Sequence, residues 1–143
     1  MMEGKKDSIE RTPSIWPSNH PSRRLTSTFG VRRDPITRGF RHHDGADISA
    51  VSGSPVLATA KGKVIFAEYD RYYGNLVKVN HGNGIHTWYA HMSEIMTNVG
   101  DTVERGEQIG TVGSTGRSTG AHIHYEVHLN GVPVDAGKYL GNQ

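Results

Sequence analysis

Short runs of β-forming residues alternate with glycine-containing turns along most of this chain, and this pattern limits the folds available to it. From Leu25 onward the runs are rich in valine, isoleucine, threonine and tyrosine, which favour strands. The runs are 55–60, 63–69, 75–81, 85–91, 108–113 and 122–129. The third and fourth are joined through Gly82-Asn83-Gly84, which is typical of a β-hairpin. We therefore predict an all-β fold, or nearly so, with antiparallel sheets in a sandwich or partly closed barrel.

Helical periodicity is almost absent. No long window repeats its apolar residues every 3.6 positions, and we expect at most one short helical turn, at residues 92–98. Residues 1–14 are polar and charged, so we expect a flexible lead-in there and one domain over residues 15–143.

Composition excludes several classes of function. The chain of 143 residues has no cysteine, which rules out disulfide frameworks, cysteine zinc sites and cysteine nucleophiles. Its formal net charge of +2 is too small to indicate a nucleic-acid-binding protein. No stretch approaches the roughly 20 apolar residues of a membrane span, and the N-terminal residues lack the apolar core of an export signal.

The run H-I-H-Y-E-V-H-L at 122–129 is the first candidate for a chemical site. Successive side chains of a strand point to opposite faces, so four polar residues share one face: His122, His124, Glu126 and His128. The first two histidines would lie roughly 7 Å apart, which suits two groups that reach one metal-centred site.

Two further stretches carry candidate residues. In R-H-H-D-G-A-D at 41–47, His43 and Asp47 could converge from a loop as zinc ligands, although this stretch taken alone favours a simple polar turn at Asp44-Gly45. In Y-A-H at 89–91, His91 ends a strand and is either a half-buried structural histidine or a catalytic one.

Together these residues fit a catalytic zinc site, which needs three protein ligands, an open position and a nearby base. Five residues are candidates for this site: His43, Asp47, His91, His122 and His124. Spacing alone does not say which three of them bind the metal. The remaining histidines are expected to point elsewhere or to face solvent, although one of them, His42, could replace its neighbour. They are His20, His42, His81, His86 and His128. The chain contains no H-E-x-x-H, G-x-S-x-G or phosphate-binding P-loop motif, and G-S-T-G-R-S-T-G at 113–120 is expected to form a wall or turn beside the site.

Taken in their order along the chain, these motifs resemble those of the lysostaphin-like (LytM) zinc endopeptidases of bacterial cell walls. The resemblance runs from about residue 15 to residue 140. It includes T-F-G-V-R-R-D-P, H-D-G-A-D, Y-A-H-M-S, G-D-T-V-E-R-G-E-Q-I-G and G-S-T-G-R-S-T-G-A-H-I-H-Y-E-V. It implies that His43, Asp47 and His124 bind one zinc ion, and that His91 and His122 act on the water and the transition state.

Small departures from the family pattern do not touch these positions. Ala121 replaces the usual proline, and Ile123 and Tyr125 replace leucine and phenylalanine. A tyrosine that helps the oxyanion in some relatives has no match upstream of His43.

The resemblance implies a zinc metalloendopeptidase that hydrolyses peptide bonds of peptidoglycan in the cell envelope. It would be a monomer that binds no nucleic acid, with an export signal or membrane anchor upstream of this chain. Two alternatives are a catalytically silent LytM-type regulator or wall-binding module, and a cupin-like metal oxygenase. The second also uses H-x-H on a β-barrel, but its glutamate lies further along the chain than Glu126 does.

Overall fold

The computed structural model describes residues 8–18, 24–27, 29–33, 40–116 and 121–141, while side chains are described only in part between residues 24 and 43. Ten of the strands in these segments form one antiparallel sheet and two form a separate ribbon. The prediction of an all-β fold is therefore confirmed.

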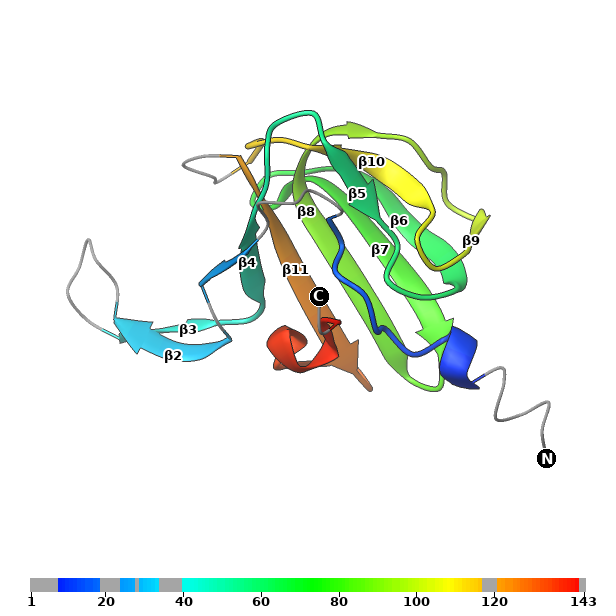
Figure 1. The fold of residues 1–143 in the computed structure, drawn as a ribbon, viewed down its shortest axis with the longest axis horizontal. Coiled ribbons are helices and arrows are strands. Elements are labelled where there is room, and N and C mark those ends of the chain that lie inside the picture. Colours follow the sequence, from blue (N-terminus) through cyan, green and yellow to red (C-terminus); the bar gives the residue numbers. More distant parts are fainter. Residues whose placement is uncertain (1–7, 19–23, 28, 34–39, 117–120, 142–143) are drawn as a thin grey trace.

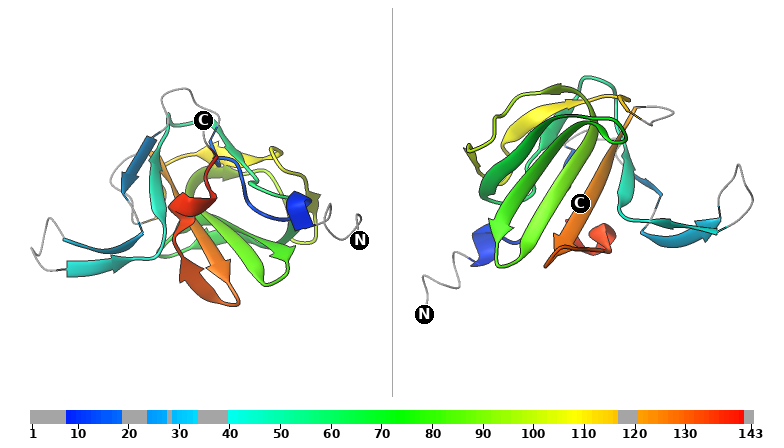
Figure 2. Two further views of the ribbon diagram at one scale, coloured as in Figure 1. Left: turned by 60° about the horizontal axis from the view of Figure 1, so that its bottom comes forward. Right: turned by 180° about the vertical axis from the view of Figure 1, so that it is seen from behind.

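Four long strands make up the centre of the sheet and position the candidate site (Figures 1 and 2). They lie in the order β11 (His122–Leu129), β8 (Ile85–Ile95), β7 (Gly74–Gly82) and β6 (Gly62–Asp70). The hairpin predicted across Gly82-Asn83-Gly84 joins β7 to β8. Asn83 and both glycines adopt positive φ angles, which a tight turn of this kind requires.

Shorter strands complete the main sheet. On the far side of β11 lie β4 (Ala46–Ser49) and β1 (Arg24–Ser27), and β12 (Val132–Val134) also pairs with β11. β9 (Thr102–Val103) pairs with β6. A 3₁₀ helix, η1 (Ala136–Tyr139), follows β12.

β8 belongs to two layers of the fold. Its first part pairs with β7 and β11, and its last part pairs with β10 (Gln108–Val112), which in turn pairs with β5 (Pro55–Leu57). Figure 1 shows β5 and β10 lying over the upper ends of the long strands. Because residues 92–95 lie inside β8, the helical turn expected for residues 92–98 is wrong over that stretch.

The core lies on the face of β11 that the alternation predicts. Ile123, Tyr125 and Val127 are fully buried there, packed against residues from β8, β7 and β10. Tyr125 and Tyr89 both hydrogen-bond Thr59 through their hydroxyl groups, which satisfies polar atoms that are otherwise sealed in the core. The opposite face of β11 is thereby left for the polar side chains.

Two segments flank this sheet. β2 (Gly30–Arg33) and β3 (Phe40–His43) form the ribbon that extends to one side in Figures 1 and 2. Residues 8–18 run along the domain, where Arg105 donates hydrogen bonds to the carbonyl oxygens of Ile9, Glu10 and Thr12. Among the described segments, no helix is long and apolar enough to cross a membrane.

Candidate active site

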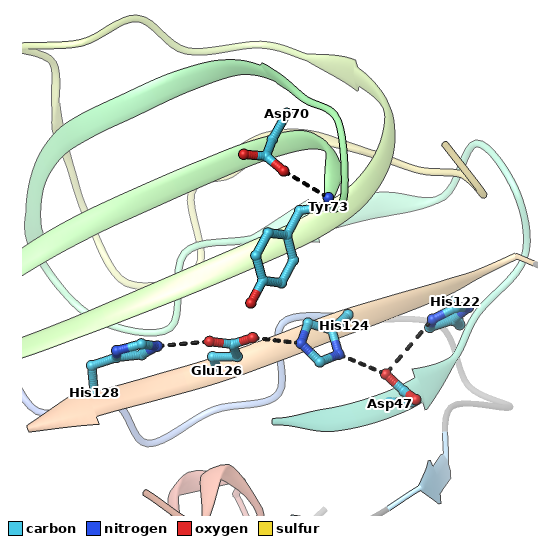
Figure 3. Close-up of polar contacts among 7 residues, drawn as sticks. All are labelled: Asp47, Asp70, Tyr73, His122, His124, Glu126 and His128. Carbon is cyan, nitrogen blue, oxygen red and sulfur yellow. Dashed lines mark hydrogen bonds and ion pairs between the residues drawn. The ribbon is translucent and has the colours of Figure 1, made fainter. Parts of the chain in front are cut away.

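Asp47 and His124 face each other across two neighbouring strands. They are direct partners in the register of β4 and β11, and Oδ1 of Asp47 lies 2.9 Å from Nδ1 of His124 (Figure 3). The same carboxylate oxygen lies 3.6 Å from Nε2 of His122. The polar face of β11 and the end of the H-x-G-x-D element therefore meet, as the predicted site requires.

Gly45 allows the close approach of these two strands. A Cβ atom at this position would lie 2.4 Å from the carbonyl oxygen of Tyr125 and 2.7 Å from Cγ of Glu126. It would also lie 3.1 Å from Cε1 of His124. Any side chain here would push β4 away from β11, so the glycine of this motif is needed for space rather than for an unusual backbone angle.

His91 enters the site from the bend in β8. It lies between the part of β8 that pairs with β11 and the part that pairs with β10, and its φ angle is +61°. This conformation is uncommon for a residue other than glycine. It brings the His91 ring centroid within 5.2 Å of that of His122 and 5.9 Å of that of His124.

The loop after β10 holds the His91 ring. Nδ1 of His91 lies 2.6 Å from the carbonyl oxygen of Thr115, in the stretch expected to form a wall of the site. A carbonyl oxygen only accepts, so His91 carries its proton on Nδ1, and Nε2 is left as the basic nitrogen. Burial lowers the pKa of His91, against the opposing effect of the bond to Thr115, so the ring is neutral at pH 7.

Glu126 lies behind His124, on the side away from Asp47 (Figure 3). Its side chain is only 1% exposed, and Oε2 lies 2.7 Å from Nε2 of His124. Burial raises the pKa of Glu126, but hydrogen bonds from His124 and His128 outweigh burial and lower it to about 2. Burial likewise lowers the pKa of His124, and its bonds to Asp47 and Glu126 outweigh that effect and raise the pKa to about 9.

Tyr73 covers His124 from the turn between β6 and β7. The two ring centroids lie 5.7 Å apart. Burial, followed by the charge of Glu126, raises the pKa of Tyr73, so the hydroxyl keeps its proton. Asp70 holds the turn by accepting the backbone N–H groups of Tyr72 and Tyr73 at 2.8 and 2.9 Å.

Four of the five residues singled out in the sequence lie together in the structure. They are Asp47, His91, His122 and His124. The fifth, His43, ends β3 opposite Gly30, but its side chain lies outside the described part of the structure. The side chain of His42 and all of His20 also lie outside it.

Two of the histidines expected to point elsewhere or to face solvent are buried, and one of them, His128, differs from that expectation because it lies on the site face. His81 lies in the interior, where Nε2 lies 2.6 Å from Oγ1 of Thr87. His128 lies on the site face, bonded to Glu126. Sequence reasoning did not include Tyr73, Glu126 or His128 in the site, although strand alternation already placed the last two on the face of His124.

The described donors are compatible with a zinc site. Two ligand atoms on a tetrahedral zinc ion lie roughly 3.3 Å apart, close to the 2.9 Å between Asp47 and His124. Glu126 occupies the other ring nitrogen of His124, so Nδ1 is the atom that faces Asp47. Within the described residues alone, no group of three or more histidine, aspartate or glutamate side chains could hold an ion.

Comparisons with known proteins point in the same direction. The model of peptidase family M23 matches residues 41–136. The DD-carboxypeptidase/endopeptidase Mpg of Neisseria meningitidis serogroup B is 48% identical over 112 residues, which cover 78% of this chain and 26% of Mpg. The peptidoglycan DD-endopeptidase ShyA of Vibrio cholerae is 39% identical over 133 residues, which cover 92% of this chain and 31% of ShyA. This chain thus spans about a quarter to a third of these relatives.

A solved structure shares the fold. The crystal structure of a zinc-containing peptidase from Vibrio cholerae superposes with a TM-score of 0.82 at 37% sequence identity. The match covers 90% of this chain and 40% of the other.

Proposed function

This chain belongs to peptidase family M23, the lysostaphin-like (LytM) peptidases, and from that premise we propose that it is a zinc-dependent endopeptidase that hydrolyses peptide bonds of peptidoglycan. The observation that carries the proposal is that His122 and His124 both contact Asp47 while the His91 ring lies beside both histidines. The names of Mpg and ShyA support a peptidase that acts on peptidoglycan.

We assign the zinc ligands to His43, Asp47 and His124. The pairing of Asp47 with His124 supports this assignment, and the H-x-G-x-D spacing supports His43. When bound, zinc lowers the pKa of a water molecule to near 7 and polarises a carbonyl group.

His91 is the better candidate for the general base. Its Nδ1 proton is committed to the carbonyl of Thr115, so Nε2 can take a proton from water in the site. His122 then has the second role, in which it donates a hydrogen bond to the developing oxyanion or a proton to the leaving amine. The 5.2 Å between the two ring centroids leaves both histidines within reach of one scissile bond.

The substrate determines where the protein works. Peptidoglycan lies outside the cytoplasmic membrane, so we expect this domain to act in the cell envelope. The greater length of Mpg and ShyA is compatible with further segments that direct or anchor such a domain.

Digestion of purified peptidoglycan tests the function. We expect soluble fragments cut at peptide bonds, identified by mass spectrometry, and we expect a zinc chelator to abolish their release. Added zinc should restore it, and metal analysis should find about one zinc ion per chain. Intact peptidoglycan after treatment with folded, zinc-loaded protein would instead indicate a regulator or wall-binding module, and iron in place of zinc would indicate an oxygenase.

A further inference from the structure

Glu126 is a buried carboxylate that the proposed reaction does not use, yet each of its oxygen atoms is bonded. Oε2 lies 2.7 Å from Nε2 of His124, and Oε1 lies 2.7 Å from Nε2 of His128. The Tyr73 ring lies over His124 beside the same carboxylate, with 5.7 Å between the ring centroids of Tyr73 and His124. One histidine on each oxygen of a carboxylate with 1% exposure indicates a specific arrangement rather than an incidental contact.

We propose that Glu126 is a positioning residue that holds the Nε2 proton of His124, so that Nδ1 faces Asp47, and that His128 in turn holds Glu126 in place. The inference rests on the proposed zinc site but concerns residues to which the catalytic scheme gives no role.

An ionised carboxylate only accepts hydrogen bonds, and this decides the orientation of the His124 ring. Because Glu126 takes the proton on Nε2, the nitrogen available to a metal ion is Nδ1. Nδ1 is also the nitrogen that lies 2.9 Å from Asp47. A carboxylate that binds the far nitrogen of a ligating histidine fixes the ring and makes it a better donor.

His128 is itself held by a stack that crosses the sheet. Its ring stacks on Trp88 with a centroid distance of 4.3 Å and an interplanar angle of 13°. The Lys78 ammonium group lies 3.9 Å from the centroid of the same indole ring. Trp88 pairs with Glu126 in the β8–β11 register and with Lys78 in the β7–β8 register. Regular strand geometry therefore places Lys78, Trp88 and Glu126 in one row across the sheet.

Replacement of Glu126 by glutamine tests this role without a change in size. His124 and His128 bond different oxygens of Glu126, and glutamine replaces one of these oxygens by an NH₂ group, which donates and cannot accept the N–H of the histidine that faces it. We expect the affinity for zinc, measured by competition with a chromophoric chelator, to fall about 10- to 100-fold. The matched control is Glu68→Gln, at an exposed carboxylate of β6, which should bind zinc as the wild type does.

A spectroscopic signal separates positioning from a general structural effect. In ¹⁵N-histidine-labelled protein, the Nε2 proton of His124 should resonate far downfield because its acceptor is charged. In Glu126→Gln this resonance should move upfield, while the rest of the spectrum still shows a folded protein. Unchanged zinc affinity together with an unchanged His124 resonance would overturn the proposal.

A second variant decides the question if Glu126→Gln does not fold. His128→Phe keeps a ring on Trp88 but removes the donor to Glu126. We expect a smaller loss of zinc affinity and a shifted His124 resonance, and no change in either would overturn the role of His128. Neither readout requires hydrolysis. If the wild-type protein binds zinc but leaves peptidoglycan intact, only the proposed endopeptidase activity is contradicted. If the wild type cleaves peptidoglycan but Glu126→Gln leaves the zinc affinity and the His124 resonance unchanged, only the positioning role is contradicted.

Discussion

The Nδ1 atom of His91 lies 2.6 Å from the carbonyl oxygen of Thr115, in the loop that follows β10. The backbone N–H of His91 donates to the carbonyl oxygen of Tyr73, at 2.8 Å, in the turn between β6 and β7. Two loops that are distant in sequence therefore fix both the backbone and the ring of the proposed base. Its tautomer and its orientation follow from tertiary contacts.

Replacement of His91 should separate catalysis from metal binding. We expect His91→Asn to retain zinc and to lose activity by about 100- to 10,000-fold, the usual contribution of a general base. Asparagine is preferable to alanine because it tolerates the positive φ angle of this position better. Metal content and rates of peptidoglycan cleavage are the measurements, and Asp47→Asn is the counterpart that should lose the metal. An active His91→Asn enzyme would exclude His91 as the base.

Gly74 should be intolerant of a side chain because it packs against the loop that holds His91. A Cβ atom there would lie 2.5 Å from the backbone of Thr115, and the φ angle is +69°. We expect Gly74→Ala to lower activity by displacing the Thr115 carbonyl, in addition to a strain of roughly 1–2 kcal/mol. Gly53→Ala has a similar positive φ angle and no neighbour within 4 Å, so it should show the strain alone. Equal activity of the two variants would contradict this account.

Gly45→Ala should weaken zinc binding without the removal of any ligand. The added methyl group would collide with the backbone of Tyr125 and with Glu126, and so would separate β4 from β11. We expect a marked loss of zinc affinity in a chelator competition, with Gly53→Ala as the control at an open position. Wild-type affinity in Gly45→Ala would show that the site does not depend on this close packing.

Stability should decline in mild acid because of His81. Burial lowers the pKa of His81 from its ordinary value of 6.5 to about 4, although the hydrogen bond to the backbone carbonyl oxygen of Lys61 opposes this shift. Between these values the unfolded chain binds a proton that the folded chain does not, so stability falls as the pH drops from 6.5 to 4. The loss attributable to this group is on the order of 3 kcal/mol.

Two measurements test this expectation. Denaturant unfolding at a series of pH values should show a smaller acid-dependent loss in His81→Gln than in the wild type. In NMR, the His81 ring should remain neutral in the folded protein at pH 5.5. A ring that titrates near 6.5 would contradict the assignment.

Much of the fold and of the candidate site was predictable from local pattern. The alternation of residues 122–129 placed Ile123 and Tyr125 in the core and His122 and His124 on the opposite face, because strand geometry alone decides which way a side chain points. The ordered motifs selected Asp47 and His91 as well. The extension of β8 through residues 92–95 was missed, because pairing with β10 overrides a weak local preference.

Sequence by itself therefore determined the all-β class, the faces of the strands and the set of residues that could do chemistry. Tertiary structure decided how they are used: the positive φ angle that brings His91 into the site, the Thr115 carbonyl that sets its tautomer, and the pairing of β4 with β11 that places Asp47 against His124. The physical reason is the separation along the sequence over which each effect acts. Strand periodicity acts between neighbouring residues, whereas hydrogen bonds between residues 24 positions apart, as in the pair His91 and Thr115, form only when the packed sheet brings the loops together.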